Sequence, residues 1–188
     1  VTNYNGVNIV LDDADGTANP SISPNLINFS NGVFSGVVTV TQSTPLVLRV
    51  GQGSGLATDQ TGSAITINPA VLSNFAVVVS SPQTTGTAFT IGSVTARDTY
   101  NNTITTFNAS TNNVTITASN GGSMTNNILN LAGDFVSGVA NLATKATTYT
   151  GPSSPGGITF TATSAGPIVN GTSGNVVIDN ASTNKYVI

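Results

Sequence analysis

The sequence predicts an all-β fold, and three features of the 188-residue chain lead to that prediction. Short runs rich in Val, Ile, Thr and Phe recur between clusters of Gly, Pro, Asn and Ser, a pattern typical of strands joined by turns. Within these runs apolar and hydroxyl side chains alternate, as in Val114, Ile116 and Ala118 with Thr residues between them, so one face is expected in a core and the other in water. The periodicity of amphipathic helices is nearly absent.

Each expected strand is an apolar, β-branched run that turn residues interrupt. Gly6 precedes the first run, Pro45 precedes the run that begins at Leu46, and Pro69 follows the run that ends at Ile67. The strands expected on this basis cover residues 7–11, 36–41, 46–50, 64–67, 75–80, 89–97, 103–107, 114–118, 139–144, 158–163 and 175–178.

An internal repeat organises the chain. Residues 64–70 and 74–77 reappear as 175–181 and 185–188, at an offset of 111 residues. Upstream, Ser35-Gly36 matches Ser137-Gly138 at an offset of 102, and Leu46-Val47-Leu48 matches Ile158-Thr159-Phe160. The growing offset predicts a loop insertion across residues 147–157, which leaves a fold unchanged.

The repeat predicts two modules. Residues 1–73 form a module that lacks its opening strands, since nothing there is equivalent to residues 75–108. Residues 74–188 form a complete module that ends in the first strand of a following one, because Lys185-Tyr186-Val187-Ile188 matches the start of the second module. Two explanations stay open: the chain is a window of a longer tandem array, or subunits complete one another by strand donation.

The stretch from Pro82 to Ile104 resembles the opening of bacterial immunoglobulin-like repeats of surface-layer and invasin-like adhesin proteins. Gly86, Phe89, Val94, Ala96, Asp98, Asn102 and Thr103 fall on fixed positions of that pattern, and Asn101 replaces its usual Gly. The resemblance covers most of residues 75–188. It implies tandem immunoglobulin-like β-sandwiches and an extracellular scaffold, although such modules serve as spacers, adhesive tips and lattice elements alike.

Composition excludes several classes of function. Charged residues make up 6% of the chain, against roughly 25% in an average soluble domain. The four basic residues are dispersed, so we expect no nucleic-acid binding. No run of about 20 apolar residues predicts a transmembrane helix. The scarcity of Lys and the absence of Glu favour an extracellular or cell-surface location, because cytoplasmic proteins usually depend on charge for solubility.

Catalysis is not expected. The chain contains no His, Cys or Glu, which removes the common general bases and the thiol nucleophile. Most Asp residues are isolated in sequence, so a pair of catalytic carboxylates is not indicated. The four Tyr and the lack of Trp give no dense aromatic platform for sugar stacking.

A calcium site is the main chemical candidate. Asp12, Asp13 and Asp15 gather hard oxygen ligands before Gly16, and such ligands suit Ca²⁺ better than Zn²⁺. An Asp-rich turn explains the same residues without a metal. Asp98 is expected to close a turn by accepting backbone hydrogen bonds through Tyr100 and Asn102.

Modification sites follow from sequence triplets. Six N-glycosylation sequons occur, at Asn28, Asn101, Asn108, Asn113, Asn170 and Asn180, although a chain so rich in Asn, Ser and Thr produces such triplets by chance. Lys145 is expected to be an ordinary solvated lysine and not the donor of an intramolecular isopeptide bond.

The sequence therefore predicts an extracellular structural protein, a segment of an S-layer, a stalk or a fibre, that acts by associating with copies of itself or with neighbouring modules. The alternative is a calcium-dependent adhesin module that binds a surface glycan or protein through the loop at Asp12 to Asp15.

Overall fold

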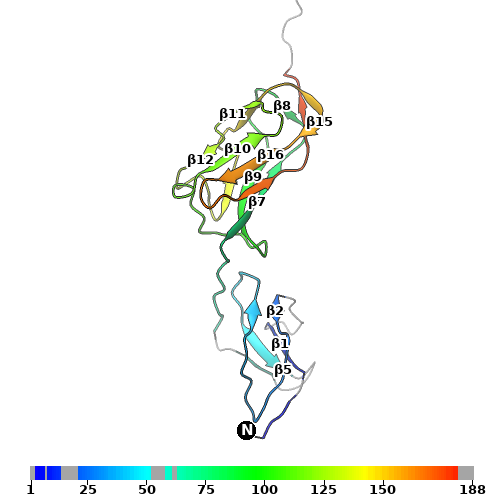
Figure 1. Cartoon of the computed structure of the whole chain (residues 1–188), viewed down its shortest axis with the longest axis vertical. Coiled ribbons are helices and arrows are strands. Elements are labelled where there is room, and N and C mark those ends of the chain that lie inside the picture. Colours follow the sequence, from blue (N-terminus) through cyan, green and yellow to red (C-terminus); the bar gives the residue numbers. More distant parts are fainter. Residues whose placement is uncertain (1–2, 7, 14–20, 52–57, 61–62, 182–188) are drawn as a thin grey trace, which may run out of the picture. The chain divides into compact units, whose positions relative to one another are not determined.

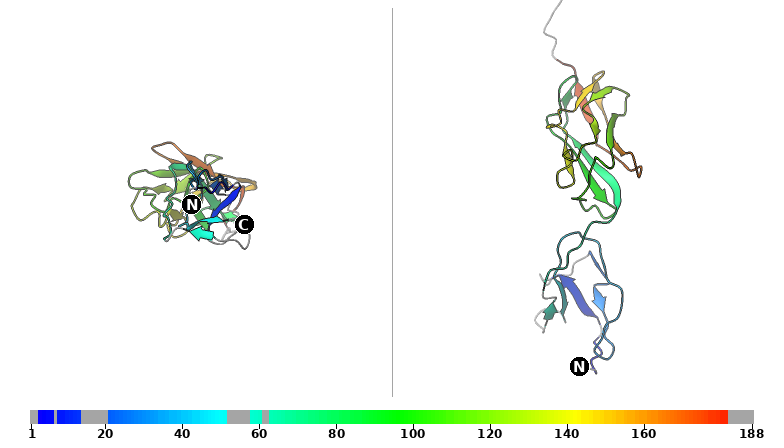
Figure 2. Two further views of the ribbon diagram at one scale, coloured as in Figure 1. Left: turned by 90° about the horizontal axis from the view of Figure 1, so that it is seen from below. Right: turned by 90° about the vertical axis from the view of Figure 1, so that its left-hand side faces the viewer.

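The computed structural model describes residues 3–6, 8–13, 21–51, 58–60 and 63–181. Every regular element among them is a β-strand, which confirms the all-β prediction (Figures 1 and 2). The described residues contain no helix that is long and apolar enough to cross a membrane. The chain divides into two compact units, unit 1 (Val1–Pro69) and unit 2 (Ala70–Ile188).

The described residues of unit 2 form four small sheets. One has the order β12-β10-β16-β17, a second β13-β9-β7, a third β15-β18-β8, and β11 pairs with β14. All pairs are antiparallel except β8 with β18. The strands are β7 (Leu72–Val79), β8 (Gln83–Thr84), β9 (Gly92–Asp98), β10 (Val114–Ala118), β11 (Ser123–Thr125), β12 (Ile128–Leu129), β13 (Val139–Asn141), β14 (Thr148–Thr150), β15 (Ser154–Ile158), β16 (Phe160–Ser164), β17 (Asn170–Thr172) and β18 (Val176–Asp179).

One apolar core joins the sheets of unit 2. β9 shows a strict alternation of buried and half-buried residues, with Val94 and Ala96 inaccessible to solvent. Aromatic rings pack edge-on across the core, with centroids 5.0 Å apart for Phe89 and Phe160. Alternate residues of the predicted strands therefore supply the core, as the period of two requires.

Unit 1 has a four-stranded sheet of order β3-β1-β5-β6 and a short β2–β4 pair. Its buried apolar residues among those described are Ile9, Leu11, Ile22, Ile27 and Leu46, a much smaller set than in unit 2. The strands are β1 (Ile9–Asp13), β2 (Ile22–Ser23), β3 (Leu26–Ile27), β4 (Thr39–Val40), β5 (Leu48–Gly51) and β6 (Thr58–Gln60).

The two units share one sheet order. β3-β1-β5-β6 of unit 1 corresponds strand for strand to β12-β10-β16-β17 of unit 2. The registers agree as well, because Leu11 pairs with Val50 as Ile116 pairs with Ala162. The bridge between Leu46 and Ile65 likewise matches the pair of Ile158 and Val176. The internal repeat is thus a repeat of backbone pairing.

The structure corrects part of the predicted alignment. The hairpin turns that match are Asn31-Gly32 and Ser137-Gly138, which have positive φ and lie inside equivalent bridges, Ser30 with Val33 and Val136 with Val139. Their offset is 106 residues, so the match of Ser35-Gly36 to Ser137-Gly138 is wrong. Between the matched hairpins and the matched strands β5 and β16 the offset grows from 106 to 112, so unit 2 is longer there, but residues 147–157 contain β14 and most of β15 and are not a plain loop.

Several expected strands are shorter in the structure or are not regular strands. Residues 103–107 make one bridge, between Thr103 and Arg97 of β9. They do not continue along β9 because β13 and the hairpin turn before it pair with the same edge of β9, where Ala96 N donates to Gly138 O. The strand expected to reach residue 144 ends at Asn141, whose side chain accepts from the backbone N–H groups of the following turn. In unit 1, residues 64–67 form only the Ile65 bridge.

The unit boundary lies between Pro69 and Ala70, whereas the sequence placed it between residues 73 and 74. The difference has a local cause, since Ala70 N donates to Asp98 Oδ2 at 2.9 Å. This bond attaches the chain to unit 2 before β7 begins. That residues 1–73 and 74–188 are immunoglobulin-like modules stays a prediction.

Candidate functional site

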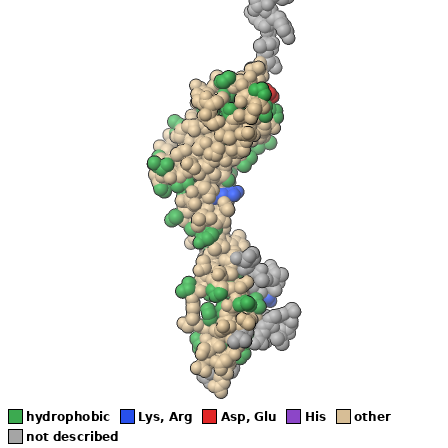
Figure 3. Space-filling view, turned by 45° about the vertical axis from the view of Figure 1, so that its right-hand side comes forward, with side chains coloured by type: hydrophobic (Ala, Val, Ile, Leu, Met, Phe, Trp, Pro, Cys, Tyr) green, Lys and Arg blue, Asp and Glu red, His purple; other side chains and the backbone are tan. Residues whose placement is uncertain are grey.

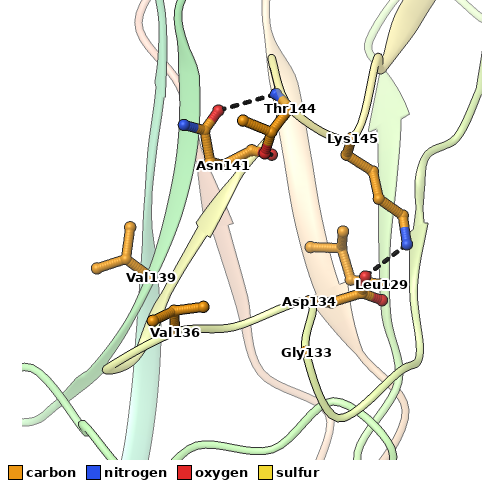
Figure 4. Close-up of a pocket in the computed structure, with 8 residues that line it drawn as sticks. All are labelled: Leu129, Gly133, Asp134, Val136, Val139, Asn141, Thr144 and Lys145. Carbon is orange, nitrogen blue, oxygen red and sulfur yellow. Dashed lines mark hydrogen bonds and ion pairs between the residues drawn. The ribbon is translucent and has the colours of Figure 1, made fainter.

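A cavity of about 200 Å³ lies in unit 2 beside β13 (Figure 4). Its apolar lining comes from Leu129 at the end of β12, from Val136 before the hairpin turn and from Val139 at the start of β13. Its polar lining includes Asp134 and Lys145, which form an ion pair with Nζ 2.5 Å from Oδ1. The cavity therefore combines an apolar rim with one charged pair.

Asp134 is the electrostatic centre of this cavity. Its carboxylate accepts hydrogen bonds from the backbone N–H groups of Asn130 and Leu131 at 2.7 and 2.9 Å. Burial alone would raise the pKa of Asp134, but the hydrogen bond from Lys145, the two backbone bonds and the Lys145 charge together lower it below its ordinary value. Asp134 is thus ionised at neutral pH.

Unit 1 lacks the segment that carries Asp134. Strand β3 of unit 1 matches β12 of unit 2, and the hairpin that follows β3 matches the hairpin that follows β12. Only Asn28 and Phe29 lie between the two matched elements in unit 1, where they align with Asn130 and Phe135. Residues 131–134 are therefore an insertion of unit 2. In unit 2 this insertion caps the end of β12. The ion pair then joins it to the turn after β13, where Lys145 lies.

The geometry of the cavity favours a structural role over ligand binding. A volume of about 200 Å³ is below the roughly 300 Å³ at which small-molecule pockets begin. An amide between Lys145 and Asp134 would need the neutral amine to attack a protonated carboxyl, whereas the pKa of Asp134 is lowered. The hydrogen bonds to Asp134 thus favour its carboxylate form, which pairs with Lys145 in a salt bridge.

A second cluster surrounds the buried Asp98 at the end of β9. Oδ1 accepts from the backbone N–H groups of Tyr100 and Asn102 at 2.8 and 2.9 Å, and Oδ2 accepts from Asn102 Nδ2 at 2.8 Å as well as from Ala70. The predicted turn is confirmed. Asn101 has φ of 66° inside it, a conformation that Gly and Asn adopt most readily, which explains Asn at that position.

Full burial would raise the pKa of Asp98, yet the hydrogen bonds from Asn102, Ala70 and Tyr100 lower it below the ordinary value. Four donors around one carboxylate leave no open coordination position for a metal ion. The cluster is therefore a clamp between the start of unit 2 and the β9 turn.

The predicted calcium residues are only partly described. Asp12 and Asp13 are the last residues of β1 and pair with Arg49 and Leu48, while Asp15 lies outside the described residues. In the described part of the chain no three acidic, His or Cys residues gather as metal ligands. The calcium site stays a prediction.

The six sequon asparagines are all exposed: Asn28, Asn101, Asn108, Asn113, Asn170 and Asn180. They do not gather on one element, and two of them already serve the fold. Asn28 Oδ1 accepts from Asn8 N, and Asn108 Oδ1 accepts from Ser110 N. The structure thus places these side chains at the surface and brings none of them into the cavity.

Sequence reasoning missed the role of Asp134 and gave Lys145 the wrong environment. Lys145 is not an ordinary solvated lysine, because its side chain is 25% exposed and paired with the nearly buried Asp134. One signal was present. Asp134 and Lys145 lie in two segments that are longer than their unit 1 counterparts. The growing offset of the repeat already indicated the segment with Lys145, whereas the segment with Asp134 becomes visible only when the two hairpins are matched.

No protein-family model, curated protein or solved structure matches the chain.

Proposed function

We propose that the chain is an extracellular structural protein built of immunoglobulin-like β-sandwich modules, which acts by associating with copies of itself or with neighbouring modules. The observation that carries this proposal is the same four-stranded sheet order in both units. Repeated copies of one fold in a polypeptide act as structural units of similar size. The function of such a protein is to hold other components at a set distance.

The surface chemistry supports association. On the face in Figure 3, charged side chains are sparse and apolar side chains are scattered among polar ones. The net charge of −3 gives little repulsion between neighbours. Several large apolar side chains are open to solvent in unit 2, among them Leu131 at 61% and Val136 at 70%.

Electron microscopy and analytical ultracentrifugation of the purified chain test this proposal. We expect ordered oligomers or filaments without added ligand. Val136→Lys adds a charge at an exposed apolar position and is expected to shift association to higher protein concentration. Thr111→Lys, at another exposed position of unit 2, is the matched control and is expected to have little effect.

A chain that stays monomeric at all concentrations would contradict self-association. Calcium-dependent binding of a surface glycan or protein by that monomer, measured by calorimetry, would support the alternative of a calcium-dependent adhesin module. Loss of that binding in Asp13→Asn would assign the calcium to the loop after β1.

A further inference from the structure

Unit 1 leaves open a row of side chains that unit 2 buries. Val176 and Ile178 of β18 are each 1% exposed. At the matching positions of unit 1, Ile65 is 40% exposed and Ile67 is only partly buried. The residues are equally apolar, so the difference lies in what covers them.

The neighbouring strand shows the same difference. Phe160 and Ala162 of β16 are inaccessible to solvent. Leu48 and Val50, which take their places in β5, are only partly buried. Burying apolar surface contributes roughly 25 cal/mol per Å². Binding of another apolar segment over these side chains is therefore favourable.

In unit 2 the matching row shares one core with β7 and β9. β7 and β9 form a long antiparallel pair, and Phe75, Val77, Val94 and Ala96 bring its inner face into the shared core. Among the described residues of unit 1, β1 is the first strand and it matches β10. No described strand of unit 1 therefore takes the place of β7 and β9.

We propose that this face of unit 1, formed by Leu48, Val50, Ile65 and Ile67, binds a β-hairpin of the β7–β9 type from another module of the same kind. The proposal rests on the structural role proposed above and deepens it, because it names the surface through which one module completes the next. The occupant has an uncharged inner face of Phe, Val and Ala, as β7 and β9 do.

One position limits where the hairpin lies. In unit 2 a Cβ on Gly171 of β17 would lie 1.7 Å from Phe75 O of β7, so β7 approaches there only because the residue is Gly. The matching residue of β6 is Asp59. The hairpin therefore lies over β5 and the Ile65 bridge and stays further from β6 than β7 does from β17.

The test extends the full chain at Val1 by a copy of its own residues 70–105. Leu11 and Ile116 match at an offset of 105, which puts Val1 at the position of Thr106, so the copy joins without a linker. Hydrogen exchange of the amides in β1 and β5 is the measurement. We expect exchange there to slow by about tenfold or more, while exchange in β10 and β16 serves as the internal reference.

The control extension has the same length but carries Val77→Asp and Val94→Asp within the added copy, which removes its apolar face. Equal exchange in the extended and unextended chains would overturn the proposal, and so would equal slowing by the control. Slowing in the unextended chain that grows with protein concentration would show that a second copy covers the face while its own β7 and β9 stay in unit 2, and it would overturn the hairpin as the occupant. If the added hairpin slows exchange in β1 and β5 but the chain forms no oligomers, this inference is supported and the self-association proposed above is contradicted.

Discussion

Asp98 shows how one side chain connects the start of unit 2 to its core. The carboxylate is buried at the end of β9 and holds three backbone N–H groups and one amide. Hydrogen bonds to a charged acceptor are the stronger kind. The sequence predicted the local part of this arrangement, the bonds to Tyr100 and Asn102, because they depend only on spacing. The bond from Ala70 depends on β7 and β9 lying side by side, and no local pattern contains it.

Asp98→Asn should destabilise unit 2 by about 3 kcal/mol, because an amide group would present donors where the carboxylate accepts, leaving buried N–H groups unpaired. The measurement is the denaturant midpoint of unit 2. Asp179→Asn is the control, since Asp179 is exposed and its replacement should stay within about 0.5 kcal/mol. Equal effects of the two substitutions would show that the Asp98 clamp contributes little.

Acid should destabilise unit 2 through Asp98 and Asp134. Both carboxyls have a pKa below the ordinary 3.8 in the folded chain, so the unfolded chain binds protons at higher pH than the folded one. Their contribution is therefore complete above about pH 5 and is lost as pH falls below about 4 toward the folded pKa values. Denaturation of unit 2 at pH 7 and at pH 2.5 checks this. The double variant Asp98→Asn, Asp134→Asn should show a smaller loss on acidification, and an unchanged loss would contradict it.

At the scale of elements, the contact between β17 and β7 depends on a residue without a side chain. Gly171→Ala should destabilise unit 2 by more than about 2 kcal/mol, because its Cβ would collide with the backbone of Phe75 and force the strands apart. Gly174→Ala is the matched control, since a Cβ there meets nothing within 4 Å. Thermal unfolding compares the two variants, and equal midpoints would refute this close approach.

The loop between β12 and β13 depends more on Asp134 than on Lys145. Lys145→Met removes one partner of a partly exposed ion pair and should cost about 1 kcal/mol. Asp134→Asn also weakens the backbone bonds from Asn130 and Leu131 and should cost about 2 kcal/mol. Urea denaturation of both variants measures the loss of unfolding free energy. A larger loss for Lys145→Met would show that the ion pair contributes more than the backbone hydrogen bonds to Asp134.

At the scale of the whole molecule, the two units differ in the size of their cores. Unit 2 buries apolar residues from β7, β9, β10, β13, β16 and β18, whereas the described residues of unit 1 bury few. Since stability rises with buried apolar area, unit 1 should unfold first. Calorimetry should show two transitions, and limited proteolysis should cut within residues 3–69 before unit 2. A single transition with simultaneous cleavage would contradict this difference.

The sequence by itself predicted the strand content, the alternation of core and solvent faces along strands such as β10, and the existence of a repeat, because alternation and turn residues are local properties. β10 at Val114–Ala118 coincides with the expected strand. Short strands such as β3 and β12 escaped prediction because two residues carry too little pattern.

The tertiary structure alone decided which partners the local patterns meet. It showed that Asn31-Gly32 and not Ser35-Gly36 forms the matching hairpin, that Asp134 and Lys145 pair across an insertion, and that Ile65 lies open where Val176 is covered. These outcomes depend on contacts between residues far apart in the chain. Burial and pairing are set by such neighbours, and a run of sequence does not specify its neighbours.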